Sequence, residues 1–115
     1  MMEDKKVKVK AVLLIEDVFP HEKIRSVKEA RVKVKLLSLE DDRILLDEPL
    51  RFELRELVDK RTIREALSIR FNNIKIKKVE VKARNDVKKK FLEELKELKK
   101  KMKEEKERLR KMLRR

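Results

Sequence analysis

The 115-residue sequence contains no glycine, cysteine, tryptophan or tyrosine. Phosphate-cradling loops of the GxxxxGK[ST] and GxGxxG types need glycine, because the backbone must approach the phosphates closely. The lack of cysteine excludes disulfide frameworks, Cys-ligated zinc, iron–sulfur clusters and thiol nucleophiles. The single histidine, His21, excludes a multi-histidine metal site. P-loop and Rossmann enzymes are therefore excluded, together with most ways of binding a transition metal.

Long apolar runs are also missing. The longest one, Ala11 to Ile15, is far shorter than the roughly 20 residues that a membrane span needs. The first residues, Met1 to Asp4, lack the charged-then-apolar order of a signal peptide. We therefore expect a soluble, cytoplasmic protein.

Charge is abundant and mostly positive. Charged residues make up 51% of the chain, and 36 Lys and Arg against 23 Asp and Glu give a net charge of +13. The 40% of hydrophobic residues is enough for a folded core. Heavy use of Lys, Glu and Arg is typical of hyperthermophiles, which predicts an archaeal or viral source from a hot environment. The excess of cations predicts a polyanionic partner.

Apolar and polar residues alternate over residues 6–16 and again over 31–39, as in half-buried β-strands. Asp41 and Asp42 separate the second run from residues 43–46. Because aspartate tolerates turn geometry, this pattern predicts a hairpin.

Two segments are less regular. Residues 21–29 follow Pro20 and place Ile24 and Val27 on one side, which predicts a short helix. Residues 50–54 alternate like a strand, although the same leucines also fit one helical face. For this second segment we favour a strand.

The stretch from residue 59 to 83 combines a helix signal with a hairpin signal. The S/T-x-x-E motif at Thr62 to Glu65 predicts a short helix over 59–67, with an extended strand as the alternative. Asn72-Asn73 predicts a tight turn that pairs residues 69–71 with 74–76. The doubled lysine at 77 and 78 predicts a β-bulge, because it shifts the later alternation.

Residues 85–115 predict one helix about 45 Å long, capped by Asn85-Asp86, because no proline interrupts them. Apolar residues recur at heptad spacing, with Glu105 at the one missing core position. We predict a coiled coil; the alternatives are a solvent-exposed helix or one that folds back on its own domain. The predicted oligomer interface comprises Phe91, Leu95, Leu98, Met102, Leu109 and Met112.

These elements predict an α+β protein in two parts. Residues 1–84 form a small β-rich domain of antiparallel hairpins with one or two short helices, and residues 85–115 form a basic amphipathic helix. Because the strands carry their own apolar face, we expect residues 1–84 to fold without the helix.

No catalytic constellation stands out, and we predict a non-enzymatic protein with no cofactor, no metal and no small-molecule substrate. Glu80 and Lys82 have the carboxylate-x-Lys spacing of metal-dependent nucleases, but a magnesium site needs further convergent carboxylates. His21 is interpreted as a solvated loop histidine, and no serine has a histidine partner in the sequence pattern.

The distribution of cations on the expected strands is the main functional signal. They lie at polar positions, so adjacent strands would form one cationic surface for phosphate backbones. The four phenylalanines, at residues 19, 52, 71 and 91, all occupy apolar positions, which argues against base stacking and for duplex or structured nucleic acid. The predicted nucleic-acid-binding residues are Lys8, Lys10, Arg31, Lys33, Lys35, Lys75 and Lys77.

Two other functions fit the same sequence. The C-terminal helix could dock a protein partner in an assembly, with the lysines serving solubility and heat tolerance. Alternatively, Phe91, Leu92, Leu95 and Leu98, flanked by lysines, could rest on a membrane surface. We favour sequence-independent nucleic-acid binding combined with self-association through the helix.

Overall fold

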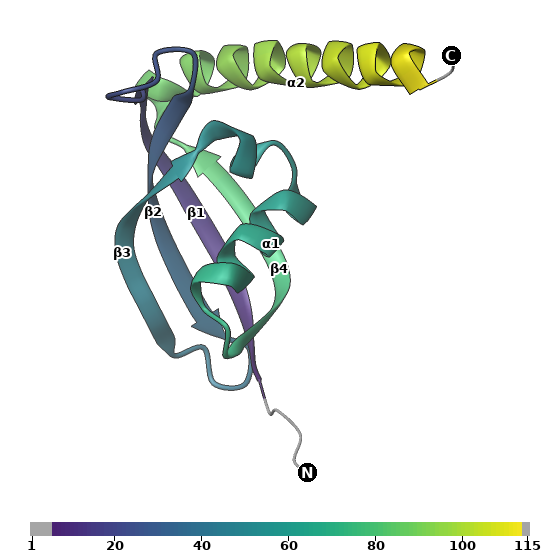
Figure 1. The fold of residues 1–115 in the computed structure, drawn as a ribbon. Coiled ribbons are helices and arrows are strands. Elements are labelled where there is room, and N and C mark those ends of the chain that lie inside the picture. Colours follow the sequence, from purple (N-terminus) through teal and green to yellow (C-terminus); the bar gives the residue numbers. More distant parts are fainter. Residues whose placement is uncertain (1–5, 114–115) are drawn as a thin grey trace.

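The computed structural model describes residues 6–113 and shows one four-stranded sheet with two α-helices (Figure 1). The strands lie in the order β3-β2-β1-β4; β1 pairs antiparallel with β2 and parallel with β4, and β2 pairs antiparallel with β3. The α+β class and the long C-terminal helix are thus confirmed, with a mixed sheet in place of hairpins alone. The elements are β1 (Val7–Pro20), β2 (Lys28–Ser38), β3 (Ile44–Glu53), the 3-10 helix η1 (Leu54–Leu57), α1 (Lys60–Arg70), β4 (Ile74–Ala83) and α2 (Asn85–Leu113).

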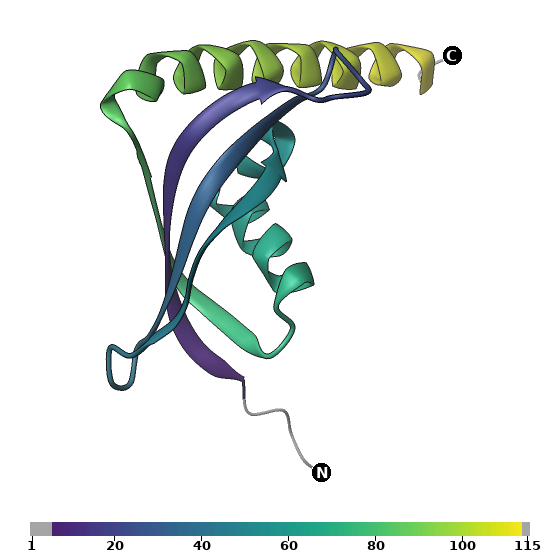
Figure 2. The same cartoon turned by 90° about the vertical axis from the view of Figure 1, so that its left-hand side faces the viewer.

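The two faces of the sheet differ. In Figure 2, α1 lies against one face of the curved sheet and α2 crosses one end of it, whereas the opposite face has no helix over it in the described part of the chain. The alternation in β1 follows this division, since Val9, Leu13 and Ile15 are fully buried. Ile63 and Leu67 of α1 complete the same core. The uncovered side is called the open face below.

The first two predicted strands are confirmed as β1 and β2, and so is the predicted hairpin, which joins β2 to β3. The turn between β2 and β3 places Asp42 at a φ of 57°, in the left-handed region that aspartate tolerates. Asp41 accepts a hydrogen bond from the backbone N–H of Arg43 at 3.1 Å, which holds the turn. Residues 50–53 belong to β3, as favoured from their alternation.

The short helix predicted over residues 21–29 is wrong. Strand β1 continues to Pro20, which pairs with Lys28 of β2, so only residues 21–27 remain as a loop between the two strands. The Nδ1 atom of His21 accepts the backbone N–H groups of Lys23 and Ile24 at 3.1 and 3.2 Å. Ile24 is 53% exposed, so this segment has no buried apolar face to stabilise a helix.

The hairpin predicted across Asn72-Asn73 is also wrong, although the turn itself is present. Helix α1 runs to Arg70 and buries Ile63, Ala66 and Leu67, so the residues before the turn are helical. Burial at helical spacing therefore outweighs the short alternation of residues 69–71.

Strand β4 crosses over to pair with β1. The predicted bulge is confirmed, because Ile76 pairs with Val9 and Lys78 with Lys10, which leaves Lys77 without a partner.

Helix α1 is present as predicted but starts differently. The carboxylate of Asp59, and not the Thr62 side chain, provides the N-cap, with Asp59 Oδ1 accepting the Thr62 N–H at 2.7 Å. At α2 the backbone carbonyl of Arg84 accepts the N–H groups of Val87 and Lys88, so Arg84 occupies the capping position predicted for Asn85-Asp86.

Helix α2 is anchored along its first part only. Val87, Phe91 and Leu95 are buried against the sheet and η1, and Leu98 is partly buried. The C-terminal half extends beyond the sheet (Figures 1 and 2). The first part of the helix therefore adds to the core of the sheet domain, and the expectation that residues 1–84 fold without the helix stays a prediction. Within residues 6–113, no helix combines the length and apolarity that crossing a bilayer would take.

Candidate nucleic-acid interface

Six of the seven cations predicted to bind nucleic acid lie on the open face. The strand register brings them together, with Lys8 of β1 beside Lys75 of β4 and Lys10 beside Lys78. Strand β2 adds a row of three, Arg31, Lys33 and Lys35, that alternates with buried residues. The seventh, Lys77, is the bulged residue and lies at the β4 edge, where it lines a hollow with Arg64 of α1.

Part of this surface is neutralised by carboxylates. The ammonium group of Lys33 lies 3.6 Å from Asp47, and the guanidinium of Arg31 lies 3.5 Å from Glu16. The Lys10 ammonium group is 3.4 Å from Glu80. These three cations therefore offer less attraction to phosphates than their number suggests.

Glu80 is shared between two lysines. The Lys82 side chain donates a hydrogen bond to its carboxylate, and the positive charges of Lys10 and Lys82 add to this, so the pKa of Glu80 is lowered. The carboxylate-x-Lys pair noted in the sequence is thus an internal ion pair. Among residues 6–113, no three histidine and acidic side chains converge as metal ligands.

Four lysines of β1 and β4 that have no ion pair among residues 6–113 lie together at the β4 edge of the sheet. The positive charge of Lys75, a small loss of hydration at the exposed Lys77 ammonium group and the positive charge of Lys8 together lower the pKa of Lys77. The strand register places Lys8 beside Lys75, and Lys77 lies two residues further along β4. The β4-edge cluster comprises Lys8, Arg64, Lys75, Lys77 and Lys78. No ion pair within residues 6–113 joins an acid to any of these five cations.

Two members of the cluster were missed by the sequence analysis. Lys78 faces the open side because the bulge at Lys77 shifts the alternation by one residue. Because the bulge itself was predicted, the sequence already indicated that Lys78 lies on the polar side of the strand. Arg64 reaches the cluster only because α1 lies beside β4, and this follows from the crossover connection that the predicted hairpin left out.

The phenylalanines have structural roles. Phe52 and Phe91 are 1% and 4% exposed, and the other two are partly buried. The guanidinium of Arg70 lies 4.2 Å from the centre of the Phe52 ring, and that of Arg51 lies 5.4 Å from the Phe19 ring. The phenylalanine rings therefore do not supply an exposed platform for stacking bases.

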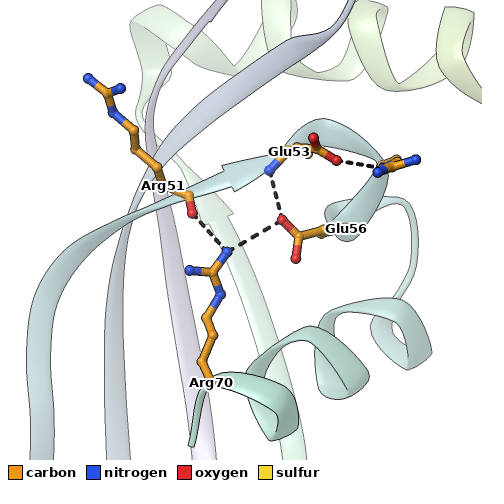
Figure 3. Close-up of polar contacts among 5 residues, drawn as sticks. Arg51, Glu53, Glu56 and Arg70 are labelled. Carbon is orange, nitrogen blue, oxygen red and sulfur yellow. Dashed lines mark hydrogen bonds and ion pairs between the residues drawn. The ribbon is translucent and has the colours of Figure 1, made fainter. Parts of the chain in front are cut away.

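Arg70 ties the end of α1 to β3 and η1 (Figure 3). One of its Nη atoms donates to the Arg51 carbonyl at 2.9 Å and to Glu56 at 3.4 Å. The Glu56 carboxylate also accepts the backbone N–H of Glu53, and Arg55 pairs with the Glu53 side chain. The charges of Arg55, Arg70, Glu53 and Glu56 thus have partners within the chain, so the group stabilises the fold and is not a candidate site.

The residues predicted as an oligomer interface fall into two groups. Phe91 and Leu95 are buried in the chain's own core, where they cannot meet another molecule. Met102, Leu109 and Met112 are 43%, 60% and 67% exposed. Only this second group, with Leu98 at its border, is free to form an interface.

Comparison with known proteins identifies no relative: no family model, no curated protein and no solved structure matches the chain.

Proposed function

We propose that this protein binds duplex or structured nucleic acid through its phosphate backbone, without catalysis, and that it self-associates through the exposed half of α2. The β4-edge cluster is the observation that carries the first part. Its five cations lie along this edge, none of them in an ion pair among residues 6–113, and their mutual repulsion is relieved when phosphates approach. Because the phenylalanines lie in or near the core, base stacking contributes little and the preference for sequence is weak.

The ion pairs on the rest of the open face indicate which cations contribute most to phosphate binding. Lys10, Arg31 and Lys33 must release a carboxylate before they can contact a phosphate, so each contributes less than a cluster residue. Lys35 has no ion pair within residues 6–113 and extends the surface toward β2. Binding is therefore expected to centre on β4 and to weaken toward β3.

The test is fluorescence anisotropy with a labelled duplex over a salt series. If the five cluster cations neutralise about five phosphates, the log–log slope of affinity against salt is about −4 to −5. The double variant Lys75→Glu, Lys77→Glu should lose at least about tenfold in affinity for all sequences alike, and the slope should become shallower.

The matched control changes the same amount of charge elsewhere. Lys23→Glu with Arg25→Glu lies in the loop between β1 and β2 and should change affinity by less than about threefold at 150 mM salt, where such distant charges are screened. Equal losses in both double variants, or no binding by the unmodified protein at 50 mM salt, would overturn the nucleic-acid proposal.

An assembly role is the second candidate, because the C-terminal half of α2 exposes Met102, Leu109 and Met112 on one side. Light scattering on the purified full chain separates the candidates. A dimer supports self-association, whereas a monomer that binds no nucleic acid favours an arm for a different protein.

A further inference from the structure

A groove opens where α2 leaves the sheet domain. Its volume is about 420 Å³. One wall is the underside of α2, and the others are the end of the β1–β2 loop and the start of η1. The lining residues are Ser26, Val27, Lys28, Glu53, Leu54, Arg55, Glu94, Glu97, Leu98, Lys101, Met102 and Glu105.

The groove is chemically suited to the C-terminal segment of α2, residues 106–113. Leu54, Leu98 and Met102 provide an apolar floor, and the C-terminal segment exposes Leu109 and Met112 on the matching side of the helix. Such exposed apolar side chains gain stability when a partner covers them.

A chain cannot fill its own groove with this segment. Leu98 and Met112 lie in one unbroken helix, and 14 residues at a rise of 1.5 Å place them about 21 Å apart. The occupant must therefore come from another molecule.

Charge selects the orientation of that occupant. Glu94 and Glu97 line the groove. Arg108 follows Glu94 by 14 residues and Lys111 follows Glu97 by 14, which is two heptads, so these cations lie on the same side of α2 as the acids. In an antiparallel pair of identical helices, like sides face each other. Glu94 and Glu97 of one copy then face Arg108 and Lys111 of the other.

We propose that two copies of this chain exchange the C-terminal segments of α2 antiparallel, each filling the groove of the other. In this register Leu98 lies opposite Leu109 of the second copy, and Met102 lies opposite Glu105 of the second copy. Because the contact is reciprocal, it closes as a two-fold dimer. The proposal rests on the self-association proposed above but not on nucleic-acid binding.

The antiparallel register also accounts for Glu105. A parallel pair in register would place the two Glu105 carboxylates side by side at the seam, where like charges disfavour association. In the antiparallel pair each Glu105 lies next to Lys101 of the second copy, so the acid gains a cationic partner. In this register Lys99 lies opposite Lys106 and Lys101 lies near Arg108 of the second copy; these side chains are exposed, so water and salt screen the repulsion.

Disulfide trapping tests the register directly, because the chain has no cysteine of its own. Leu98→Cys and Leu109→Cys are made as separate variants and oxidised mildly, alone and as a one-to-one mixture. We expect a cross-linked dimer in the mixture only. Cross-links in each variant alone would show a parallel pair, which overturns the exchange but keeps self-association. A monomer in light scattering, with no cross-links, would refute both.

Charge reversal gives an independent test that does not depend on cysteine. Glu94→Lys with Glu97→Lys, and Arg108→Glu with Lys111→Glu, should each weaken the dimer at least about tenfold. Carrying all four changes in one chain should restore most of the affinity. Glu93→Lys with Glu107→Lys, on the outward side of α2, is the matched control. Failure of the fourfold variant to recover would contradict the proposed facing of charges.

Discussion

The two halves of α2 have the same apolar spacing and different surroundings. Phe91 and Leu95 lie in the core at 4% and 9% exposed, whereas Leu109 and Met112, in the same heptad series, are 60% and 67% exposed. A heptad series shows that one side of a helix is apolar, but it does not say what covers that side. In this protein the domain covers the first half, and the second half is exposed in the described part of the chain.

Truncation should separate the two halves most strongly. Ending the chain after Arg84 removes Val87, Phe91 and Leu95 from the core. At about 1.5–3 kcal/mol for each of these three buried apolar side chains, the loss is roughly 4.5–9 kcal/mol, comparable with the whole stability of a small domain. We expect no cooperative thermal transition for this fragment.

Ending the chain after Lys101 keeps those three side chains and should leave a folded monomer. Circular dichroism during heating, with light scattering for mass, measures both fragments. A cooperative transition in the shorter one would show that the sheet needs no helix, as the sequence alone predicted.

Point substitutions should reproduce the difference on a smaller scale. Phe91→Ala empties a site that is only 4% exposed and should cost about 3–5 kcal/mol in the free energy of unfolding. Leu109→Ala should change monomer stability by less than about 0.5 kcal/mol, because the Leu109 side chain buries little apolar surface in the monomer. Urea unfolding at protein concentrations below the dimer dissociation constant makes the comparison. Similar costs at both positions would mean that the domain supports the whole helix.

The sequence predicts local structure well wherever one pattern acts alone. The alternation in β1 and β2, the turn at Asp42 and the bulge at Lys77 depend on neighbouring residues and were predicted correctly. The segment 69–76 fits two patterns, and burial of Ile63 and Leu67 against the distant sheet decides between them. Long-range packing of this kind has no signature within the segment itself.

The candidate site was predictable to a similar degree. Alternation identified the cations of the open face, but it could not identify their ion-pair partners. Asp47 reaches Lys33 from β3 and Glu80 reaches Lys10 from β4, so these pairs require the strand order. Arg64 joins the β4-edge cluster through the crossover of α1, which the sequence analysis did not predict.

Glu105→Leu should sharpen the comparison at the seam. Glu105 lines the groove on the exposed half of α2, so the stability of the monomer should not change. The dimer should strengthen by about 1–3 kcal/mol, which is roughly five- to 150-fold in dissociation constant, because an apolar side chain then meets Met102 of the second copy. Sedimentation equilibrium gives the constant. Glu107→Leu, on the outward side, is the control, and an equal gain there would indicate nonspecific association.

The start of helix α1 offers the smallest test. Its N-cap, Asp59, accepts hydrogen bonds with its side chain, whereas Arg84 at the start of α2 accepts them with its backbone carbonyl only. The N–H and the hydroxyl of Thr62 donate to the Asp59 carboxylate and lower its pKa. A lowered folded-state pKa means that the ionised cap stabilises the fold at neutral pH and is lost as the pH falls below about 4. Asp59→Ala should therefore lower the free energy of unfolding by only about 1 kcal/mol at pH 7, because the site is exposed and water screens the charge. The loss should be smaller at pH 3, where much of the Asp59 carboxylate of the unmodified protein is protonated. The control Asp59→Asn keeps an uncharged cap and should flatten this pH dependence. Urea unfolding of both variants at pH 7 and pH 3 measures the effect. If the stability loss of Asp59→Ala is the same at both pH values, the carboxylate charge contributes nothing.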